Sequence, residues 1–152
     1  MAGKSKKKFT YEYPRPAVTV DVVLVTLEQR PRVLLIQRKK DPFAGLWALP
    51  GGFVEENEKL ADAARRELKE ETSLDIGDIE QLYTAGDPER DPRGWTVSVV
   101  YLARVDPKLL KPIAADDAAA VAWFPLDKLP KLAFDHAMLL ARAKARLADR
   151  EA

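Results

Sequence analysis

Three glutamates, Glu67, Glu70 and Glu71, stand at spacings of three and four residues within the charged stretch 51–74. In a helix these steps keep all three carboxylates within about a 100° arc. Like charges this close repel one another, so the arrangement costs stability unless the carboxylates share a cation. Carboxylate oxygens suit Mg²⁺ or Mn²⁺ better than zinc or copper. The spacing therefore indicates a divalent-cation site, although a solvated acidic face partly neutralised by neighbouring Arg and Lys residues would show the same spacing.

The stretch that carries these glutamates is expected to be an amphipathic helix, because its apolar residues recur at helical spacing. These residues are Leu60, Ala61, Ala64 and Leu68. Asn57 is the expected N-cap, since its side chain can accept a hydrogen bond from a free N–H of the first turn. Negative charge before a helix also interacts favourably with the helix dipole. Three glutamates supply that charge: Glu55, Glu56 and Glu58.

Counted from Gly52, the chain reads Gly, five residues, Glu58, seven residues, then Arg-Glu-Leu-Lys-Glu-Glu over residues 66–71. This pattern resembles the box of the Nudix hydrolases, in which the last Glu is followed by any residue, a Gly and an apolar residue. One fixed position differs, because Ser73 stands where the family has that Gly. A helix often ends in a left-handed residue, a conformation that Gly adopts more easily than Ser. The departure therefore concerns the helix end and leaves the carboxylates intact.

The resemblance implies hydrolysis of a pyrophosphate linked to a nucleoside, with Mg²⁺ or Mn²⁺ as cofactor. It places the metal on the Gly51 carbonyl and on the carboxylates of Glu67, Glu70 and Glu71. The metal would lower the pKa of a bound water, which attacks phosphorus. Glu70 or Glu71 is the expected base, with a loop carboxylate as the alternative. The catalytic set is completed by an expected ion pair that orients the helix carboxylates, formed by Arg66 and Glu58.

A second informative stretch is the polar loop 87–94, DPERDPRG. Its two arginines, Arg90 and Arg93, could bind a diphosphate or a ribose through paired hydrogen bonds. An exposed loop with local ion pairs would have the same composition. The loop resembles the ADP-ribose pyrophosphatase branch of the Nudix family, and so does the sequence FDHA at residues 134–137. We also expect Arg38, at the end of a predicted strand, to bind substrate.

An acidic pair, Asp116 and Asp117, precedes the sequence WFPL at residues 123–126 and extends the same resemblance. Relatives often carry a Glu three residues before that Trp, and this chain has Ala120 there. In several Nudix enzymes a carboxylate outside the box binds metal or acts as base. Asp116 and Asp117 are the expected substitutes near the substrate, although both could equally be plain turn residues.

Composition is typical of one globular domain. The chain has 152 residues, of which 47% are hydrophobic, and this length suits a single core. The formal net charge of +1 gives no overall basic field for nucleic acid, and the absence of cysteine excludes disulfides. No apolar run reaches the ~18–20 residues that span a bilayer. We expect a basic disordered tail over residues 1–10, either solubilising or polyanion-binding, and one domain over residues 11–152 of a cytoplasmic protein.

Hydrophobic patterns predict the remaining elements. Strands are expected over residues 17–27, 32–38, 79–84, 95–105 and 118–124, and a C-terminal amphipathic helix over residues 134–147. The first two strands are expected to form a hairpin. Together with the glutamate helix, this order fits an α/β protein with the Nudix fold, a mixed β-sheet sandwiched between helices (α/β/α).

Three functions are compatible with these patterns. The first is hydrolysis of ADP-ribose to AMP and ribose 5-phosphate. The second is a Nudix enzyme acting on another nucleotide, such as an oxidised nucleoside triphosphate. The third is a non-catalytic domain that senses ADP-ribose, because the same motifs resemble the sensing domain of regulators of NAD metabolism. Those regulators carry an additional DNA-binding domain, for which we expect no room in this chain. The expected partner is a small nucleotide, with no membrane or nucleic acid, and homodimerisation is common in this branch.

Overall fold

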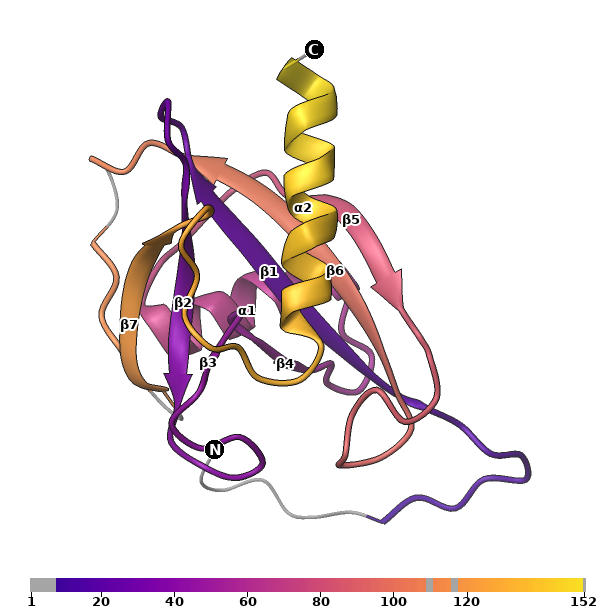
Figure 1. The fold of residues 1–152 in the computed structure, drawn as a ribbon. Coiled ribbons are helices and arrows are strands. Elements are labelled where there is room, and N and C mark those ends of the chain that lie inside the picture. The colour runs from indigo at the N-terminus through magenta and orange to yellow at the C-terminus, as the bar shows by residue number, and fades with distance from the viewer. Residues whose placement is uncertain (1–7, 109–110, 116–117, 152) are drawn as a thin grey trace.

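A computed structural model describes residues 8–108, 111–115 and 118–151 of the chain. Within these ranges a mixed sheet lies between two helices, α1 (Leu60–Thr72) and α2 (His136–Glu151), one on each face (Figure 1). The strands are β1 (Ala17–Thr26), β2 (Arg32–Arg38), β3 (Trp47–Ala48), β4 (Gly51–Phe53), β5 (Glu80–Ala85), β6 (Thr96–Val105) and β7 (Ala118–Pro125). The predicted α/β fold with a mixed sheet between helices is confirmed.

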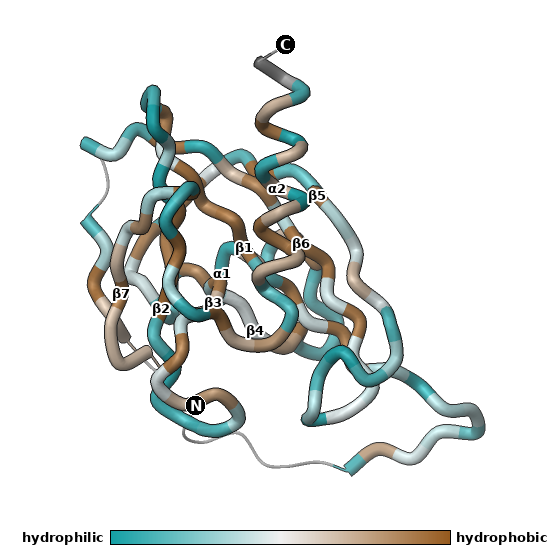
Figure 2. The backbone as a smooth tube through the Cα atoms, in the orientation of Figure 1, coloured by the Kyte–Doolittle hydropathy of each residue, from teal (hydrophilic) through white to brown (hydrophobic). Residues whose placement is uncertain are grey.

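The central strand β1 is buried on both sides because its side chains alternate between two hydrophobic clusters. Val20, Val22 and Leu24 pack toward α1, whereas Val23 and Val25 pack toward α2. Apolar residues accordingly concentrate along β1, β2 and β6 in the interior (Figure 2). The helices supply Ala63, Ala64 and Leu68 from α1 and Leu139, Leu140 and Ala143 from α2. The hydrophobic effect therefore fixes both helices against the sheet.

Strands β1 and β2 pair antiparallel at one end only, where Val25 is opposite Val33. Beyond this point the two strands separate, and we call the gap between them the β1–β2 opening. The chain that follows β2 enters this gap and forms β3 and β4. Strand β3 pairs with the end of β2, and β4 pairs with the start of β1, with Asp21 opposite Gly51. The Val22 N–H also donates to the Pro50 carbonyl at 2.9 Å. The β1–β2 opening thus holds the glycine pair beside the first half of β1 (Figure 1).

The outer strands complete the sheet in the order β3-β2-β1-β6-β5, with β7 on the other edge of β2. Strand β6 runs parallel to β1 over its full length, from Ala17 opposite Thr96 to Thr26 opposite Val105. It also pairs antiparallel with β5. Strand β6 therefore joins the first strand to the strand that precedes β6 in the chain.

The predicted N-cap of the glutamate helix is wrong. Helix α1 begins at Leu60 after an extended Lys59 with no side-chain cap, whereas Asn57 has a φ of 60° and lies in a turn. The turn closes through the Glu58 N–H, which donates to the Glu55 carbonyl at 3.1 Å, while the Glu58 carboxylate binds Arg66. This tertiary ion pair decides where the chain enters the helix, which a local capping pattern does not register.

The remaining boundaries agree with the predictions to within one or two residues at most ends, and α2 runs to Glu151 instead of 147. It begins at His136 and not at 134, because Phe134 has a left-handed φ of 52°. The short strands β3 and β4 were not predicted. The predicted tail lies mostly in residues 1–7, which fall outside the described ranges, and residues 8–10 are exposed and form neither helix nor strand.

Candidate active site

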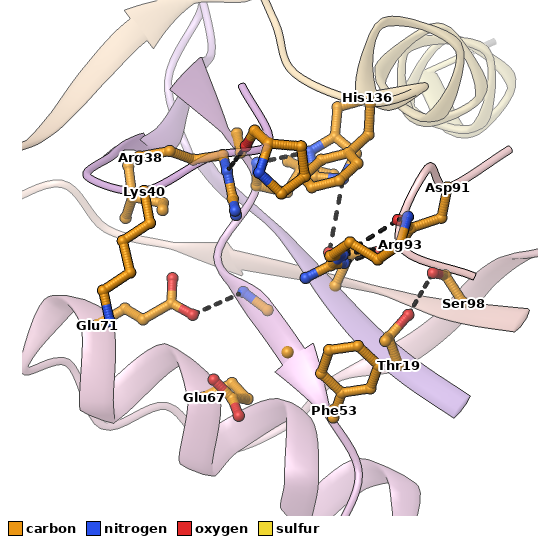
Figure 3. Close-up of a pocket in the computed structure, with 18 of the residues that line it drawn as sticks. Thr19, Arg38, Lys40, Phe53, Glu67, Glu71, Asp91, Arg93, Ser98 and His136 are labelled. Carbon is orange, nitrogen blue, oxygen red and sulfur yellow. Dashed lines mark hydrogen bonds and ion pairs between the residues drawn. The ribbon is translucent and has the colours of Figure 1, made fainter. Parts of the chain in front are cut away.

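A cavity of about 560 Å³ lies at the β1–β2 opening. Its wall combines β1, the end of β2 with the loop that follows, β4, α1, loop 90–93 and the residues at the start of α2. The charged residues on its wall are Asp21, Arg38, Lys39, Lys40, Asp41, Glu55, Arg66, Glu67, Glu71, Arg90, Asp91 and Arg93. Glu67 and Glu71 of α1 lie on one side, and Arg38 and Arg93 lie across the cavity from them (Figure 3).

The acidic side of the cavity comes from successive turns of α1. Glu67 and Glu71 line the cavity, and Glu71 is only 8% exposed. Burial raises the pKa of the Glu71 carboxyl well above its usual value, and the neighbouring Glu67 raises it further. Burial also raises the pKa of Glu67, although Arg66 opposes this effect. Two buried acids this close favour either a shared proton or a bound cation.

The glycine pair lets the backbone of β4 approach these carboxylates. The Gly51 N–H donates to Glu71 Oε1 at 3.3 Å. A Cβ atom at Gly52 would lie 2.5 Å from the Glu67 carboxyl carbon, and one at Gly51 would lie 2.2 Å from the Val20 carbonyl oxygen. Any side chain at either position would therefore displace the strand or the glutamate, which explains why glycine is required.

Arg66 connects the acidic residues around the cavity. Its Nε donates to Glu58 at 2.7 Å, and its Nη1 donates to Glu67 at 2.8 Å and to Glu70 at 3.1 Å. Its Nη2 reaches a second oxygen of Glu58 and the Phe53 carbonyl. The expected ion pair between Arg66 and Glu58 is thus present. Glu70 forms part of this network but is not part of the cavity wall.

The residues present fit a divalent cation. Glu71 Oε2 is buried and has no hydrogen-bond partner among the described residues, so it is an orphaned oxygen aimed into a carboxylate pair. Oxygen donors of this kind suit hard cations. Among the residues described, no three acidic or histidine side chains already form a metal cage. Arg66 Nη1 instead lies between Glu67 and Glu70.

The three arginines expected to bind substrate all line the cavity. Arg90 is 6% exposed, and its Nε and Nη2 form a two-pronged ion pair with Asp135 at 2.8 and 2.7 Å. Arg93 binds Asp91 through Nε and Nη2. Arg38 donates from Nε to the Pro42 carbonyl at 2.8 Å. In this structure Arg90 serves to hold loop 90–93 to the start of α2, and its role toward substrate stays a prediction.

Phe134 holds two of these arginines in place. The guanidinium carbons of Arg38 and Arg93 lie 4.9 and 4.8 Å from the centre of the Phe134 ring. Phe43 meets the same ring edge-on at 4.8 Å. Cation–π contacts of this kind orient guanidinium groups without using their N–H donors. The basic wall of the cavity is therefore built on an aromatic residue from the segment that precedes α2.

His136 and Asp21 form a buried polar contact next to the glycine pair. His136 Nδ1 accepts a hydrogen bond from the Leu49 N–H at 3.0 Å, and its Nε2 lies 3.7 Å from Asp21 Oδ1. Burial lowers the pKa of His136 to about 4 and raises that of Asp21 to about 7, where Arg90 opposes the rise. The bond from Leu49 gives His136 a structural role at the start of α2.

Several cavity residues were missed from the sequence. They include Thr19, Asp21, Phe53 and Ser98, whereas Phe134 was noted only as part of the FDHA sequence. A single acid within an otherwise apolar strand was the available signal for Asp21, whereas hydroxyl and aromatic residues in strands gave none. Asp116 and Asp117, which we expected near the substrate, lie outside the described residues. Ala120, where relatives carry a Glu, lies on β7 opposite Gln37 of β2.

Residues 15–143 match the family model of the NUDIX domain. The ADP-ribose pyrophosphatase of Methanocaldococcus jannaschii is 46% identical over 129 residues, which cover 84% of this chain and 73% of the relative. The ADPR responsive transcriptional repressor NtrR of Acinetobacter baylyi is 40% identical over 141 residues, covering 90% of this chain. The chain spans only 56% of that repressor's length.

Solved structures agree with the sequence relatives. The NUDIX domain of Shewanella oneidensis NrtR, solved with ADP ribose, superposes with a TM-score of 0.81 at 41% identity and covers 89% of this chain and 90% of that one. A MutT/nudix family protein from Enterococcus faecalis gives a TM-score of 0.84 at 40% identity, covering 93% of this chain and 66% of that one. Gly52, Arg66, Glu67 and Glu71 of the box line one cavity, and the family model matches residues 15–143, so this chain belongs to the Nudix family.

Proposed function

We propose that this chain is a Nudix hydrolase that cleaves the pyrophosphate of ADP-ribose into AMP and ribose 5-phosphate. The observation that carries the proposal is one cavity with Glu67 and Glu71 on one side and Arg38 and Arg93 on the other. Such a cavity can hold the negative diphosphate while a cation is held by the carboxylates. The 46% identity to an ADP-ribose pyrophosphatase supports the choice of substrate.

Nudix hydrolases generally depend on a divalent metal, and we propose Mg²⁺ here, with Mn²⁺ as a substitute. Its ligands would be Glu67, Glu70, Glu71 and the Gly51 carbonyl. When bound, the cation supplies Lewis-acid chemistry that neutralises the diphosphate and makes water more acidic. Arg66 holds two of these carboxylates in position through Nη1.

The chain's own residues account for proton transfer and substrate binding. Glu71 is better placed than Glu70 to act as base, because it lines the cavity and its Oε2 is unpartnered among the described residues. Water attacks one phosphorus, its proton passes to the Glu71 carboxylate, and the bridging P–O bond breaks. Arg38 and Arg93 stabilise the charge that develops on the leaving phosphate.

A hydrolysis screen with Mg²⁺ tests the proposal directly. It compares ADP-ribose, NADH, diadenosine polyphosphates and nucleoside triphosphates, including oxidised ones. Preferential release of AMP and ribose 5-phosphate from ADP-ribose is the expected result. Turnover of triphosphates alone would mean that the glutamate site is correctly assigned but that ADP-ribose is not the substrate.

A second candidate is a non-catalytic domain that senses ADP-ribose. It is favoured by the similarity to the NUDIX domain of NrtR complexed with ADP ribose. The complete glutamate set, Glu67, Glu70 and Glu71, favours catalysis instead. A rise in melting temperature with ADP-ribose, without turnover of any compound in the screen, would decide for the sensor.

The proposed substrate is a small nucleotide. We propose a cytoplasmic protein without a nucleic-acid partner, which can form homodimers. None of the helices in the described part of the chain is both long and apolar enough to span a membrane. Size-exclusion chromatography with light scattering would measure the oligomeric state.

A further inference from the structure

The floor of the cavity carries three buried polar residues in register. Thr19 and Asp21 are alternate residues of β1, so both face the same side of the sheet. Ser98 lies opposite Thr19 on the parallel strand β6, and the two hydroxyl groups are hydrogen-bonded. Thr19, Asp21 and Ser98 are 5%, 7% and 2% exposed, and all three line the cavity. Figure 3 shows the hydroxyl pair at the side of the cavity near Arg93.

Asp21 is the acidic residue of this floor. Its neighbour His136 Nε2 is 3.7 Å away, which is too long for a good hydrogen bond. The Asp21 side chain is 10% exposed and lines the cavity. Because polar groups in such surroundings are stabilised by hydrogen bonds, a ligand with hydrogen-bonding groups would supply partners for this carboxyl.

The charges around the floor indicate which ligand group fits there. Arg90 is committed to Asp135 and to Ser98 Oγ, and Arg93 is committed to Asp91. The N–H groups of Arg90 and Arg93 that form these bonds are therefore already used, and a phosphate placed on this floor would find few donors. Neutral hydroxyl groups, which can donate to a carboxylate and exchange hydrogen bonds with Thr19 and Ser98, match it.

We propose that Asp21, together with the Thr19–Ser98 hydroxyl pair, binds sugar hydroxyl groups of the substrate and is a specificity-determining residue. The identity of the ligand rests on the proposed function. The diphosphate then lies between α1 and the basic wall, with one sugar directed onto β1 and β6. The hydroxyl groups belong either to the ribose of the nucleoside or to the distal ribose, and the experiment distinguishes the two.

Binding of ADP-ribose, ADP and ribose 5-phosphate is measured by calorimetry in EDTA, so that the result does not depend on turnover. Asp21→Asn keeps the shape of the side chain and removes its charge. Because hydrogen bonds to charged groups are worth about 1.5–3 kcal/mol, the Kd for ADP-ribose should rise about tenfold or more. Weaker binding of ribose 5-phosphate with unchanged ADP assigns the distal ribose, and the reverse assigns the nucleoside ribose. Either result supports the hydroxyl site.

Asp127→Asn is the matched control, because this substitution is chemically the same but affects an exposed carboxylate that forms an ion pair with Arg30. Thr19→Val, which keeps a β-branched side chain in the strand, tests the floor independently if Asp21→Asn fails to fold. Unchanged Kd values in a folded Asp21→Asn or Thr19→Val variant would overturn the hydroxyl site. So would undetectable binding of all three compounds to the unmodified chain. Failure of hydrolysis with intact ADP-ribose binding would instead overturn only the proposed function.

Discussion

Glu71 Oε1 accepts a hydrogen bond from the Gly51 N–H at 3.3 Å, although the two residues lie 20 positions apart in the chain. The contact joins the last turn of α1 to strand β4 at the β1–β2 opening. The other oxygen of the same carboxylate is buried without a partner among the residues described. One glutamate thus anchors the glycine pair through one oxygen and leaves the other for the cation that we propose.

Glu71→Gln should lower turnover of ADP-ribose by about 100-fold or more, because loss of a positioned base alone costs factors of about 10²–10⁴. The double variant Glu70→Gln/Glu71→Gln should have no measurable turnover. Burial already favours the neutral carboxyl of Glu71, so the melting temperature should stay the same or rise. Glu56→Gln, at an exposed site, is the control. Unchanged turnover in the double variant would refute the metal assignment.

Arg66→Lys should reduce both stability and kcat. Lysine keeps the charge but cannot donate to Glu58, Glu67 and the Phe53 carbonyl at once. Breaking a partly buried charged network of this kind costs about 1–3 kcal/mol. Denaturant unfolding and steady-state kinetics measure the two effects, and Arg65→Lys on the same helix is the control. A double-mutant cycle with Glu58→Gln should give a coupling energy of at least about 1 kcal/mol; additive effects would contradict the network.

The box helix and long strands could be predicted because their signals are local. Helix α1 buries one face, which produces apolar residues at helical spacing. Strands β1 and β2 are buried on both faces, which produces nearly continuous β-branched or apolar runs. The roles of Asp21 and Phe134 could not be predicted, because each depends on partners far along the chain. Asp21 lies beside Gly51 and His136, which come from two other elements.

Two further differences have the same origin. The strands β3 and β4 are two and three residues long, too short to carry a periodic pattern, and exist because the β1–β2 opening offers free edges. The failed N-cap at Asn57 reflects an ion pair between Glu58 and Arg66 that overrides local capping. At Ser73, where the family has a glycine, the helix nevertheless ends in a left-handed residue with a φ of 65°.

Ser73→Gly should stabilise the protein slightly, by about 0.5 kcal/mol, because glycine adopts the left-handed conformation without the penalty of a Cβ atom. The gain is limited by loss of the hydrogen bond from Ser73 Oγ to the Ile113 carbonyl, which is long at 3.3 Å and exposed. Ser73→Ala keeps the Cβ and loses the same bond, so it should be destabilising. Urea unfolding measures both, and a less stable Ser73→Gly would show that the contact with Ile113 dominates.

Phe134→Leu should raise the KM for ADP-ribose about fivefold to tenfold while kcat changes less than twofold. The reason is that Arg38 and Arg93 both pack on the Phe134 ring, and each such contact contributes about 0.5–1 kcal/mol at partly exposed sites. Phe9→Leu, in the exposed N-terminal segment, is the control. A fall in kcat with unchanged KM would mean that the aromatic residue acts on the glutamates and not on the basic wall.

The free energy of unfolding should depend on pH through Asp21. Its pKa is about 7 in the folded protein against a usual 3.8, so between these values the folded chain binds a proton that the unfolded chain has lost. This contribution to stability is complete below pH 3.8 and disappears as the pH rises through 7, with a slope of up to about 1.4 kcal/mol per pH unit. His136, with a pKa lowered to about 4, contributes with the opposite sign in both the unmodified chain and the variant. The stability of the unmodified chain should therefore fall relative to that of Asp21→Asn between pH 4 and 7. Urea unfolding at successive pH values measures both curves. Parallel curves would mean that Asp21 is ionised in the folded state.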